Sequence, residues 1–394
     1  MDRSTTKSLR RNSLRGGRLW LARGVLVLFS LSLCALTLEI GLRLAGSKPQ
    51  TATVLGTYYR HDPVLGWRGK PAVACRFATT NFDVVIEHGS DGFRRAKDDP
   101  KPGSNEQPSA SVWVLGDSFT WGWGVAQGET YVDRLNQQSR GVRFRNLGQS
   151  GYSAVQEYLL LKEMLEKGDR PDAVAVMFCI NDVFENVLND RTRPSAERAN
   201  DAVNIVNVPV PEPVSLNIGA WLQNHSLAYN HVYFYFMRCR QALRTTTPHL
   251  QLPTDIAGTT QWRPTGDYGP FLDDYWTLDR LIVLKEMYAR MAALCRERNI
   301  PFTVIGAPQH YDALAQICHE LDVPLIEVSE RFTLHETGPR GDQSWRFPTD
   351  THCTQLGNRL FAEAIQPQVE HIVSASGNDG TRTGKKSFPS STRR

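Results

Sequence analysis

The stretch "WVLGDSFTWGWG", residues 113–124, interrupts an apolar run with a small polar turn that contains Ser118. A serine hydroxyl is a poor nucleophile until a neighbouring base takes its proton. Among the ten histidines, His352 is the candidate base, because it alone has an aspartate two residues earlier and a helix start directly after it. Asp350 would fix the tautomer of the imidazole and stabilise the imidazolium. These residues predict a nucleophilic triad of Ser118, His352 and Asp350.

The tetrahedral intermediate of such a reaction needs hydrogen-bond donors for its oxyanion. Three candidates follow separate apolar runs: the backbone N–H of Ser118, the backbone N–H of Gly151 in "NLGQSG", and the side-chain amide of Asn181 in "IND". One such donor is worth about 10²–10³ in rate. Gly151 and Asn181 are therefore the predicted oxyanion-hole residues.

Each motif alone also has a purely structural interpretation. A Gly-Asp-Ser turn occurs by chance, and Gly148 and Gly151 suit ordinary turns. Asn181 with Asp182 can simply end a strand, and His352 can adjoin a helix cap. All four motifs in chain order, each after its own apolar run, favour catalysis.

The neighbouring polar and aromatic residues are expected to support the loops. Asp117 and Asp182 are predicted to brace them rather than react, and for Trp121 and Trp123 packing is favoured over lining the cleft. No metal site is expected, because the histidine and cysteine of "DTHC" have no matching ligands at metal spacing, and no cofactor is expected. The seven cysteines contain no CxxC pair, and no disulfide can be assigned to them.

The elements between these motifs alternate between two kinds. Five short apolar runs predict strands: "SVWVLGDS", "VRFRNLGQ", "DAVAVMFCIND", "PFTVIGAP" and "VPLIEVSE". Amphipathic stretches predict helices at about 129–139, 153–167, 275–299, 310–321 and 354–373. This alternation predicts an α/β fold with a doubly wound, five-stranded parallel sheet and helices on both faces. Ligand sites gather at the carboxyl ends of such strands, which is where the motifs fall.

The chain order Ser, Gly, Asn, His resembles the SGNH hydrolases, also called the GDSL lipase/esterase family, over about residues 111–373. "GDSFTWGWGV" resembles the first block of the family, "NLGQSG" the second, "IND" the third, and "DTH" followed by "TQLGNRL" the fifth. The resemblance implies a flavodoxin-like fold, with Ser118 as nucleophile and with Gly151 and Asn181 as oxyanion donors.

Two positions depart from the family pattern. Cys179-Ile180 stand where the third block usually has glycine before its Asn-Asp pair. Asp350 and His352 are spaced as DxH, whereas the family often has DxxH. The first departure concerns local backbone shape, and the second concerns where the carboxylate lies relative to the imidazole.

The N-terminus predicts a membrane anchor of a bacterial type. The first 23 residues carry seven Lys/Arg against one Asp, and Glu39 is the only charged residue between Arg23 and Arg43. Those 19 residues would span about 28 Å as a helix, close to the hydrocarbon thickness. The basic flank places the N-terminus in the cytoplasm and the rest outside, in the periplasm or at the cell surface. The alternative is a cleaved signal peptide, because only Gly24 to Leu38 is strictly uncharged.

The chain is therefore expected to be a single-pass membrane protein with five parts. They are a basic cytoplasmic N-terminus (1–23), a transmembrane signal anchor (24–44), a linker with a small strand-rich lead-in (45–110), the hydrolase domain (111–373, with an insertion at about 184–272) and a disordered basic tail (374–394). The net charge of +4 comes from the two ends, so the folded part is not expected to bind nucleic acid. Within the insertion, "WLQNHSLAYNHVYFYFMRCR" predicts an amphipathic helix, with packing favoured over lipid or substrate binding.

The expected function is a serine esterase that hydrolyses an acyl or acetyl ester of a small molecule or polysaccharide. One alternative is an O-acyltransferase that acts on cell-envelope or exopolysaccharide sugars, because that reaction uses the same acyl-serine intermediate. Another is a catalytically silent carbohydrate-binding protein on a hydrolase fold. The sequence leaves the substrate, the acyl chain length and the oligomeric state open.

Overall fold

The computed structural model of the chain describes twelve stretches of sequence. They are residues 3–47, 58–79, 81–95, 109–139, 141–187, 191–199, 202–212, 218–233, 235–236, 277–336, 344–348 and 350–374. The chain divides into two compact units. One comprises Met1–Thr53, Ala78–Thr80 and Ser215–Thr247, and the other comprises Val54–Phe77, Asn81–Val214 and Pro248–Arg394. Most of the predicted tail, and residues 237–272 of the predicted insertion, lie outside the described residues.

The larger unit is built on a five-stranded parallel sheet with the order β11-β10-β7-β5-β6. Its strands are β5 (Ala110–Leu115), β6 (Val142–Asn146), β7 (Ala173–Met177), β10 (Phe302–Ile305) and β11 (Leu325–Ile326). Each lies in one of the predicted apolar runs, although β11 is only two residues long. The first strand of this sheet along the chain, β5, lies inside the sheet, and the second, β6, lies at its edge. This is the flavodoxin-like order of a doubly wound fold. The predicted fold class is confirmed.

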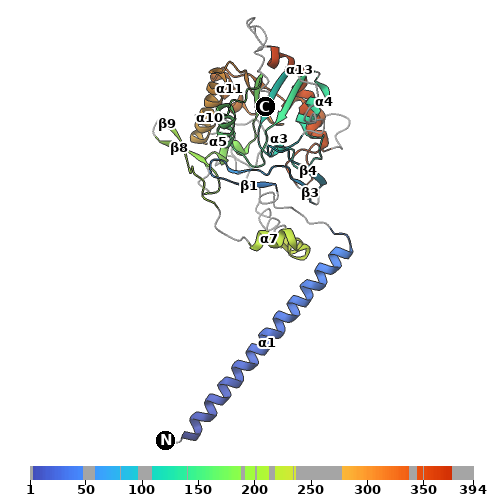
Figure 1. The fold of residues 1–394 in the computed structure, drawn as a ribbon, viewed down its shortest axis with the longest axis vertical. Coiled ribbons are helices and arrows are strands. Elements are labelled where there is room, and N and C mark those ends of the chain that lie inside the picture. Colours follow the sequence, from blue (N-terminus) through green and yellow to red (C-terminus); the bar gives the residue numbers. More distant parts are fainter. Residues whose placement is uncertain are drawn as a thin grey trace, which may run out of the picture. The chain divides into compact units, whose positions relative to one another are not determined.

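Helices cover both faces of the sheet, with α5 and α10 on one side and α4 and α13 on the other (Figure 1). The predicted helices are α4 (Tyr131–Gln138), α5 (Ala154–Glu166), α10 (Leu278–Arg296), α11 (Asp312–Glu320) and α13 (Gln355–Ser374). The structure adds α3 (Ser118–Trp121), α6 (Asn181–Glu185) and α12 (Ser329–Glu336). Apolar side chains from one face of the sheet pack with side chains of α4, α12 and α13 in a buried core. Alternate residues of each strand share that face, because successive strand residues point to opposite faces.

Short two-stranded sheets accompany the main sheet. They are β1 (Tyr59–Asp62) with β2 (Gly66–Gly69), β3 (Ala74–Ala78) with β4 (Asp83–Glu87), and β8 (Ser195–Ala199) with β9 (Ala202–Val206). The first two pairs come from the stretch predicted to be a linker and strand-rich lead-in. The third pair lies in the predicted insertion.

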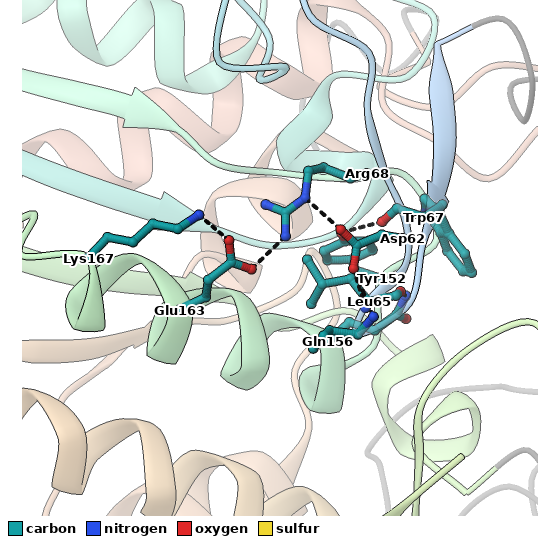
Figure 2. Close-up of polar contacts among 9 residues, drawn as sticks. Asp62, Leu65, Trp67, Arg68, Tyr152, Gln156, Glu163 and Lys167 are labelled. Carbon is teal, nitrogen blue, oxygen red and sulfur yellow. Dashed lines mark hydrogen bonds and ion pairs between the residues drawn. The ribbon is translucent and has the colours of Figure 1, made fainter. Parts of the chain in front are cut away.

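The β1–β2 hairpin is bonded to α5 by a chain of ion pairs (Figure 2). The Arg68 guanidinium lies between two carboxylates, with Nε 2.9 Å from Asp62 and Nη2 2.5 Å from Glu163. Lys167 pairs with the other oxygen of Glu163. The charges on Arg68 and Lys167 hold the pKa of Glu163 below its usual range, although burial alone would raise it. The β1–β2 hairpin of the lead-in is therefore held on α5, one of the helices that cover the main sheet, by specific ion pairs.

Direct hydrogen bonds between the hairpin and the first turn of α5 reinforce this contact (Figure 2). The Tyr152 hydroxyl donates to the Trp67 carbonyl at 2.6 Å, and the Gln156 amide donates to the Leu65 carbonyl at 2.7 Å. All four of these residues are buried. Buried and satisfied polar groups of this kind fix one relative position of the two elements.

The smaller unit contains the N-terminal helix α1 (Arg3–Leu44) and α7 (Ile218–His225), followed by helical residues 227–233 and 235–236. Within Ala22–Leu44 of α1, the most apolar 18 residues have a mean hydropathy of 2.2, and none of them is buried. By length and composition, this helix can cross a membrane or serve as a signal sequence.

Candidate active site

The turn after β5 sets the position of Ser118. Asp117 is the N-cap of α3, and its Oδ1 accepts a hydrogen bond from the Phe119 N–H at 2.9 Å. Ser118 is therefore the first residue of that short helix, at the carboxyl end of β5, which lies between β6 and β7. The Ser118 hydroxyl lies within donating distance of Asp117 Oδ2, at 3.2 Å. As predicted, Asp117 braces the loop.

The structure brings Ser118, His352 and Asp350 into one chain of hydrogen bonds, although 234 residues separate the serine from the histidine. His352 Nε2 lies 2.7 Å from Ser118 Oγ, and His352 Nδ1 lies 2.5 Å from Asp350 Oδ1. The short DxH spacing allows this contact, because the His352 backbone N–H also donates to Asp350 Oδ1 at 3.0 Å and closes a local turn.

The charge state of Asp350 follows from its partners. Burial favours the protonated carboxyl, but hydrogen bonds from His352 and Trp123 hold the pKa of Asp350 below its usual range. An ionised carboxylate only accepts hydrogen bonds, so the facing His352 Nδ1 carries a proton. In the neutral ring, Nε2 is then the acceptor for the Ser118 hydroxyl. This is the tautomer that a general base for serine requires.

Trp123 contacts both members of the acid–base pair. Its indole Nε1 donates to Asp350 Oδ2 at 2.9 Å, and its ring stacks on His352 with centroids 4.9 Å apart. The sequence favoured packing over a place in the cleft wall for this tryptophan, and the hydrogen bond to Asp350 goes beyond packing. Trp121 is fully buried, as expected.

We expect Trp123→Phe to lower kcat about tenfold with little change in KM. The phenyl ring can still stack on His352, but Asp350 loses a hydrogen bond of about 1.5 kcal/mol that helps orient the carboxylate. Steady-state kinetics with a short p-nitrophenyl ester measure the effect. Trp20→Phe, at an exposed position of α1, is the matched control. An unchanged kcat in Trp123→Phe would mean that the indole only packs.

Two backbone donors border the site. Gly151 follows β6 in a left-handed conformation, with φ of 76°, and Ser118 begins α3. Within the described part of the chain, neither of these N–H groups donates a hydrogen bond. Gly148 lets the two loops meet, because a Cβ there would lie 2.4 Å from the Trp121 nitrogen. The second loop therefore depends on a close backbone approach at Gly148.

The third predicted donor, Asn181, already has acceptors. Its Nδ2 lies 3.2 Å from the Tyr152 carbonyl and 3.1 Å from Glu185 Oε2. A side-chain amide has two N–H groups, so both are in use. Asp182, the next residue, accepts from the Cys179 N–H at 3.0 Å and braces the loop as predicted.

Glu185 is held beside Asn181 by an arginine from the predicted insertion. Arg193 Nη1 lies 2.7 Å from Glu185 Oε2 and 3.3 Å from the Gly151 carbonyl. Its guanidinium also lies over the Trp67 ring, 5.0 Å from the centroid. Burial raises the pKa of Glu185, and the charge on Arg193 opposes that rise. No local pattern in the sequence indicates this pair, which links Asn181 and Gly151.

The lead-in supplies further contacts to the turn that carries Ser118. The buried Arg94 guanidinium donates to the carbonyls of Trp121, Gly122 and Val125 at 3.1, 2.7 and 2.6 Å. His88 Nε2 accepts from the Trp121 indole at 2.9 Å. Burial lowers the pKa of His88 to about 4, so its ring is neutral and can accept.

The loop that carries Gly151 is held from the same side. The Ser150 N–H donates to the Tyr59 hydroxyl at 2.8 Å, and the Trp67 indole donates to the Ser150 carbonyl at 3.1 Å. Residues of the lead-in thus fix both backbone loops of the site. Sequence reasoning missed them, because these contacts join residues tens of positions apart.

The cysteines add no crosslink to this frame among the residues that the structure describes. The six described cysteines are free, and Cys179 is buried as the sequence suggested. The seventh, Cys239, lies outside the described residues.

The larger unit is a doubly wound α/β fold in which a serine, a histidine and an aspartate come together at the carboxyl ends of the strands, an arrangement that occurs in serine hydrolases. Residues 114–360 match the GDSL-like Lipase/Acylhydrolase family, so the chain belongs to this family and is a hydrolase of ester bonds. The resemblance seen in the sequence is confirmed. No curated protein matches the chain.

Several solved structures are similar to this chain at low identity. TesA is 12% identical, with 66% of this chain and 99% of TesA covered and a TM-score of 0.35. The psychrotrophic esterase EstA from Pseudoalteromonas sp. is 11% identical, with coverage of 67% and 99% and a TM-score of 0.36. A catalytic mutant of the acetylxylan esterase Axe2 from Geobacillus stearothermophilus is 14% identical, with coverage of 71% and 100% and a TM-score of 0.32.

Proposed function

We propose that the protein is a membrane-anchored serine esterase whose catalytic unit lies outside the cytoplasm and hydrolyses an acyl or acetyl ester through an acyl-enzyme. The observation that carries this proposal is a pair of hydrogen-bond contacts. Ser118 Oγ lies 2.7 Å from His352 Nε2, and His352 Nδ1 lies 2.5 Å from Asp350 Oδ1. In this reading, His352 is the base, Asp350 orients it and Ser118 is the nucleophile.

The two half-reactions use the same groups. Ser118 Oγ attacks the ester carbonyl carbon while its proton moves to His352 Nε2. The tetrahedral intermediate collapses, the bond to the alcohol oxygen breaks, and His352 returns the proton to the departing alcohol. Water then attacks the acyl carbon and gives a proton to His352, which passes it to Ser118 as the acid leaves.

The oxyanion of the tetrahedral intermediate is assigned to the N–H groups of Ser118 and Gly151 and to the amide of Asn181. The first two donate to no residue that the structure describes. The Asn181 amide must exchange one of its two present acceptors, the Tyr152 carbonyl or Glu185, for the oxyanion. Glu185 and Arg193 meanwhile keep the Asn181 side chain from turning into solvent.

The assignment of Asn181 predicts a kinetic effect without a binding effect. Asn181→Ala should lower kcat by about 10²–10³ and leave KM nearly unchanged, because the donor acts on charge that develops in the transition state. Initial rates over a range of ester concentrations separate the two parameters. A rise in KM alone would show that Asn181 binds the substrate instead.

A direct test of the proposed function is covalent labelling of the full-length protein with a fluorophosphonate, which reacts with an activated serine. Mass spectrometry of the digested protein should find the adduct on Ser118. An unlabelled protein, or an adduct on another residue, would contradict the proposed nucleophile.

The anchoring part of the proposal rests on α1, with its apolar stretch after a basic flank. A reporter that works only outside the cytoplasm should be active when it is fused after residue 60. The same fusion without residues 24–44 should be inactive. The full-length protein should stay with the membrane after a carbonate wash. Release by the wash would indicate that the segment is cleaved.

A further inference from the structure

Residues 218–233 and 235–236, here called the aromatic segment, contain α7 and the helical residues that follow it. The segment contains no Asp, Glu, Lys or Arg. It nevertheless exposes large apolar side chains, each more than half accessible: Ile218, Trp221, Val232, Tyr235 and Phe236. A surface helix in water normally carries charged residues on its outer face. This segment has the surface of a helix that meets something apolar.

The aromatic segment is joined to α1 at the turn between its two helices. Glu39 Oε2 accepts hydrogen bonds from the Ser226 hydroxyl and the Ala228 N–H, both at 2.9 Å. Arg43 forms an ion pair with Glu39 at 2.6 Å and donates to the His225 carbonyl at 3.1 Å. The carboxylate thus meets the N–H end of one helix and the guanidinium meets the carbonyl end of the other. Both charges suit the helix dipoles.

Two further contacts support the joint, one within the segment and one to Ser47, just after the end of α1. The Ser226 hydroxyl also accepts from the Tyr229 N–H at 3.1 Å, which caps the second helix. Ser47 Oγ lies 2.9 Å from His231 Nε2, on the next turn of that helix. The joint is therefore a set of specific polar contacts, and it leaves the large apolar side chains exposed.

The position of the joint along α1 indicates what those side chains meet. Glu39 lies inside the apolar stretch, five residues before its last residue, Leu44. Five residues of helix span about 7.5 Å, so the joint falls in the layer where a membrane-spanning helix leaves the hydrocarbon. A carboxylate at that depth is costly unless it is paired, and Arg43 and the second helix supply its partners. Lipid-facing residues of α1, such as Ile40 and Leu44, are exposed at the same level.

We propose that the aromatic segment lies in the interfacial layer of the outer leaflet and forms a second membrane contact of this chain. Trp and Tyr favour that layer, since one end of each side chain is apolar and the other is polar. Trp221 and Tyr235 lie there among the lipid headgroups, with Phe236 against the upper acyl chains. The inference rests on the proposed anchoring of α1. It replaces the packing role that the sequence favoured for this stretch.

Photo-crosslinking in the full-length protein tests this placement. Benzoylphenylalanine replaces Trp221, Tyr235 or Phe236, one at a time, in protein reconstituted into phosphatidylethanolamine–phosphatidylglycerol vesicles. We expect each position to give a lipid adduct by mass spectrometry. The same residue at Leu31 in α1 is the positive control, and at Leu334 in α12 it is a control at a position that is also exposed.

The outcomes separate the inference from the anchoring on which it rests. Lipid adducts at Leu31 without lipid adducts in the aromatic segment would overturn the inference and leave the anchoring intact. Absence of adducts at both would overturn both. Adducts to a second copy of the chain at Tyr235 and Phe236, in place of lipid, would identify a dimer surface and also overturn it.

A variant of the joint gives a second measurement. Glu39→Leu keeps the α1 stretch apolar and removes the acceptor for Ser226 and Ala228. We expect loss of the lipid adduct at Phe236 with no loss at Leu31. Unchanged labelling at Phe236 would show that the joint does not hold the segment at the membrane.

Discussion

Ser118→Ala should abolish ester hydrolysis and fluorophosphonate labelling while the protein keeps its fold. Alanine cannot form the acyl-enzyme, so only the oxyanion donors and substrate binding remain. In a well-studied serine protease, loss of the nucleophile costs about 10⁶ in kcat. Among the residues that the structure describes, the lost hydroxyl contacts Asp117 at 3.2 Å and His352 and no other polar group, so stability should change little.

The Ser118 experiment needs a control for fold and for background. Ser139, at the end of α4, has another hydroxyl, which donates to Gln366 in α13. Ser139→Ala removes it and should keep full activity. Thermal unfolding and circular dichroism of both variants check the fold. Residual activity of Ser118→Ala within tenfold of the parent protein would refute Ser118 as the nucleophile.

The second large effect concerns the short DxH spacing. Asp350→Asn should keep the structure and lower kcat by about 10⁴, because an amide cannot stabilise the imidazolium and can present its N–H to the ring, which selects the wrong tautomer. The effect should approach that of His352→Ala. Kinetics of both single variants and of the double variant measure it.

The double variant distinguishes a triad from independent contributions. Residues that act as a unit are not additive, so Asp350→Asn with His352→Ala should be scarcely worse than the worse single variant. If Asp350→Asn is nearly silent beside an inactive His352→Ala, the site works as a serine–histidine dyad and Asp350 has no part in it.

Much of the fold was accessible from the sequence because apolar runs and helical periodicity are local signals. All five strands of the main sheet and the five amphipathic helices follow from them. The convergence of Ser118, His352 and Asp350 followed from a general property of parallel sheets, whose carboxyl ends share one edge. The helix α12 and the pair β8–β9 were missed, since short elements carry few periods of any pattern.

The supporting contacts could not be predicted in the same way. Arg94 reaches carbonyls about 30 positions away, and Arg193 pairs with Glu185 across a turn of the insertion. An arginine has the same appearance in a sequence whether it is buried or solvated. Only the folded chain shows that Trp123 contacts Asp350, 227 residues later.

The contacts from Arg94, His88 and Trp67 bear on how much of the chain is needed to build the site. All five predicted site residues lie within the range that matches the family, 114–360, whereas these supports lie before it. A protein trimmed to that range would keep every reacting group and lose the guanidinium that binds three carbonyls behind Ser118, along with the indole that holds the Gly151 loop. The region that matches the family is thus smaller than the part of the chain that builds the site. Grafting or shortening this hydrolase should keep the chain from Tyr59, where the first hairpin begins.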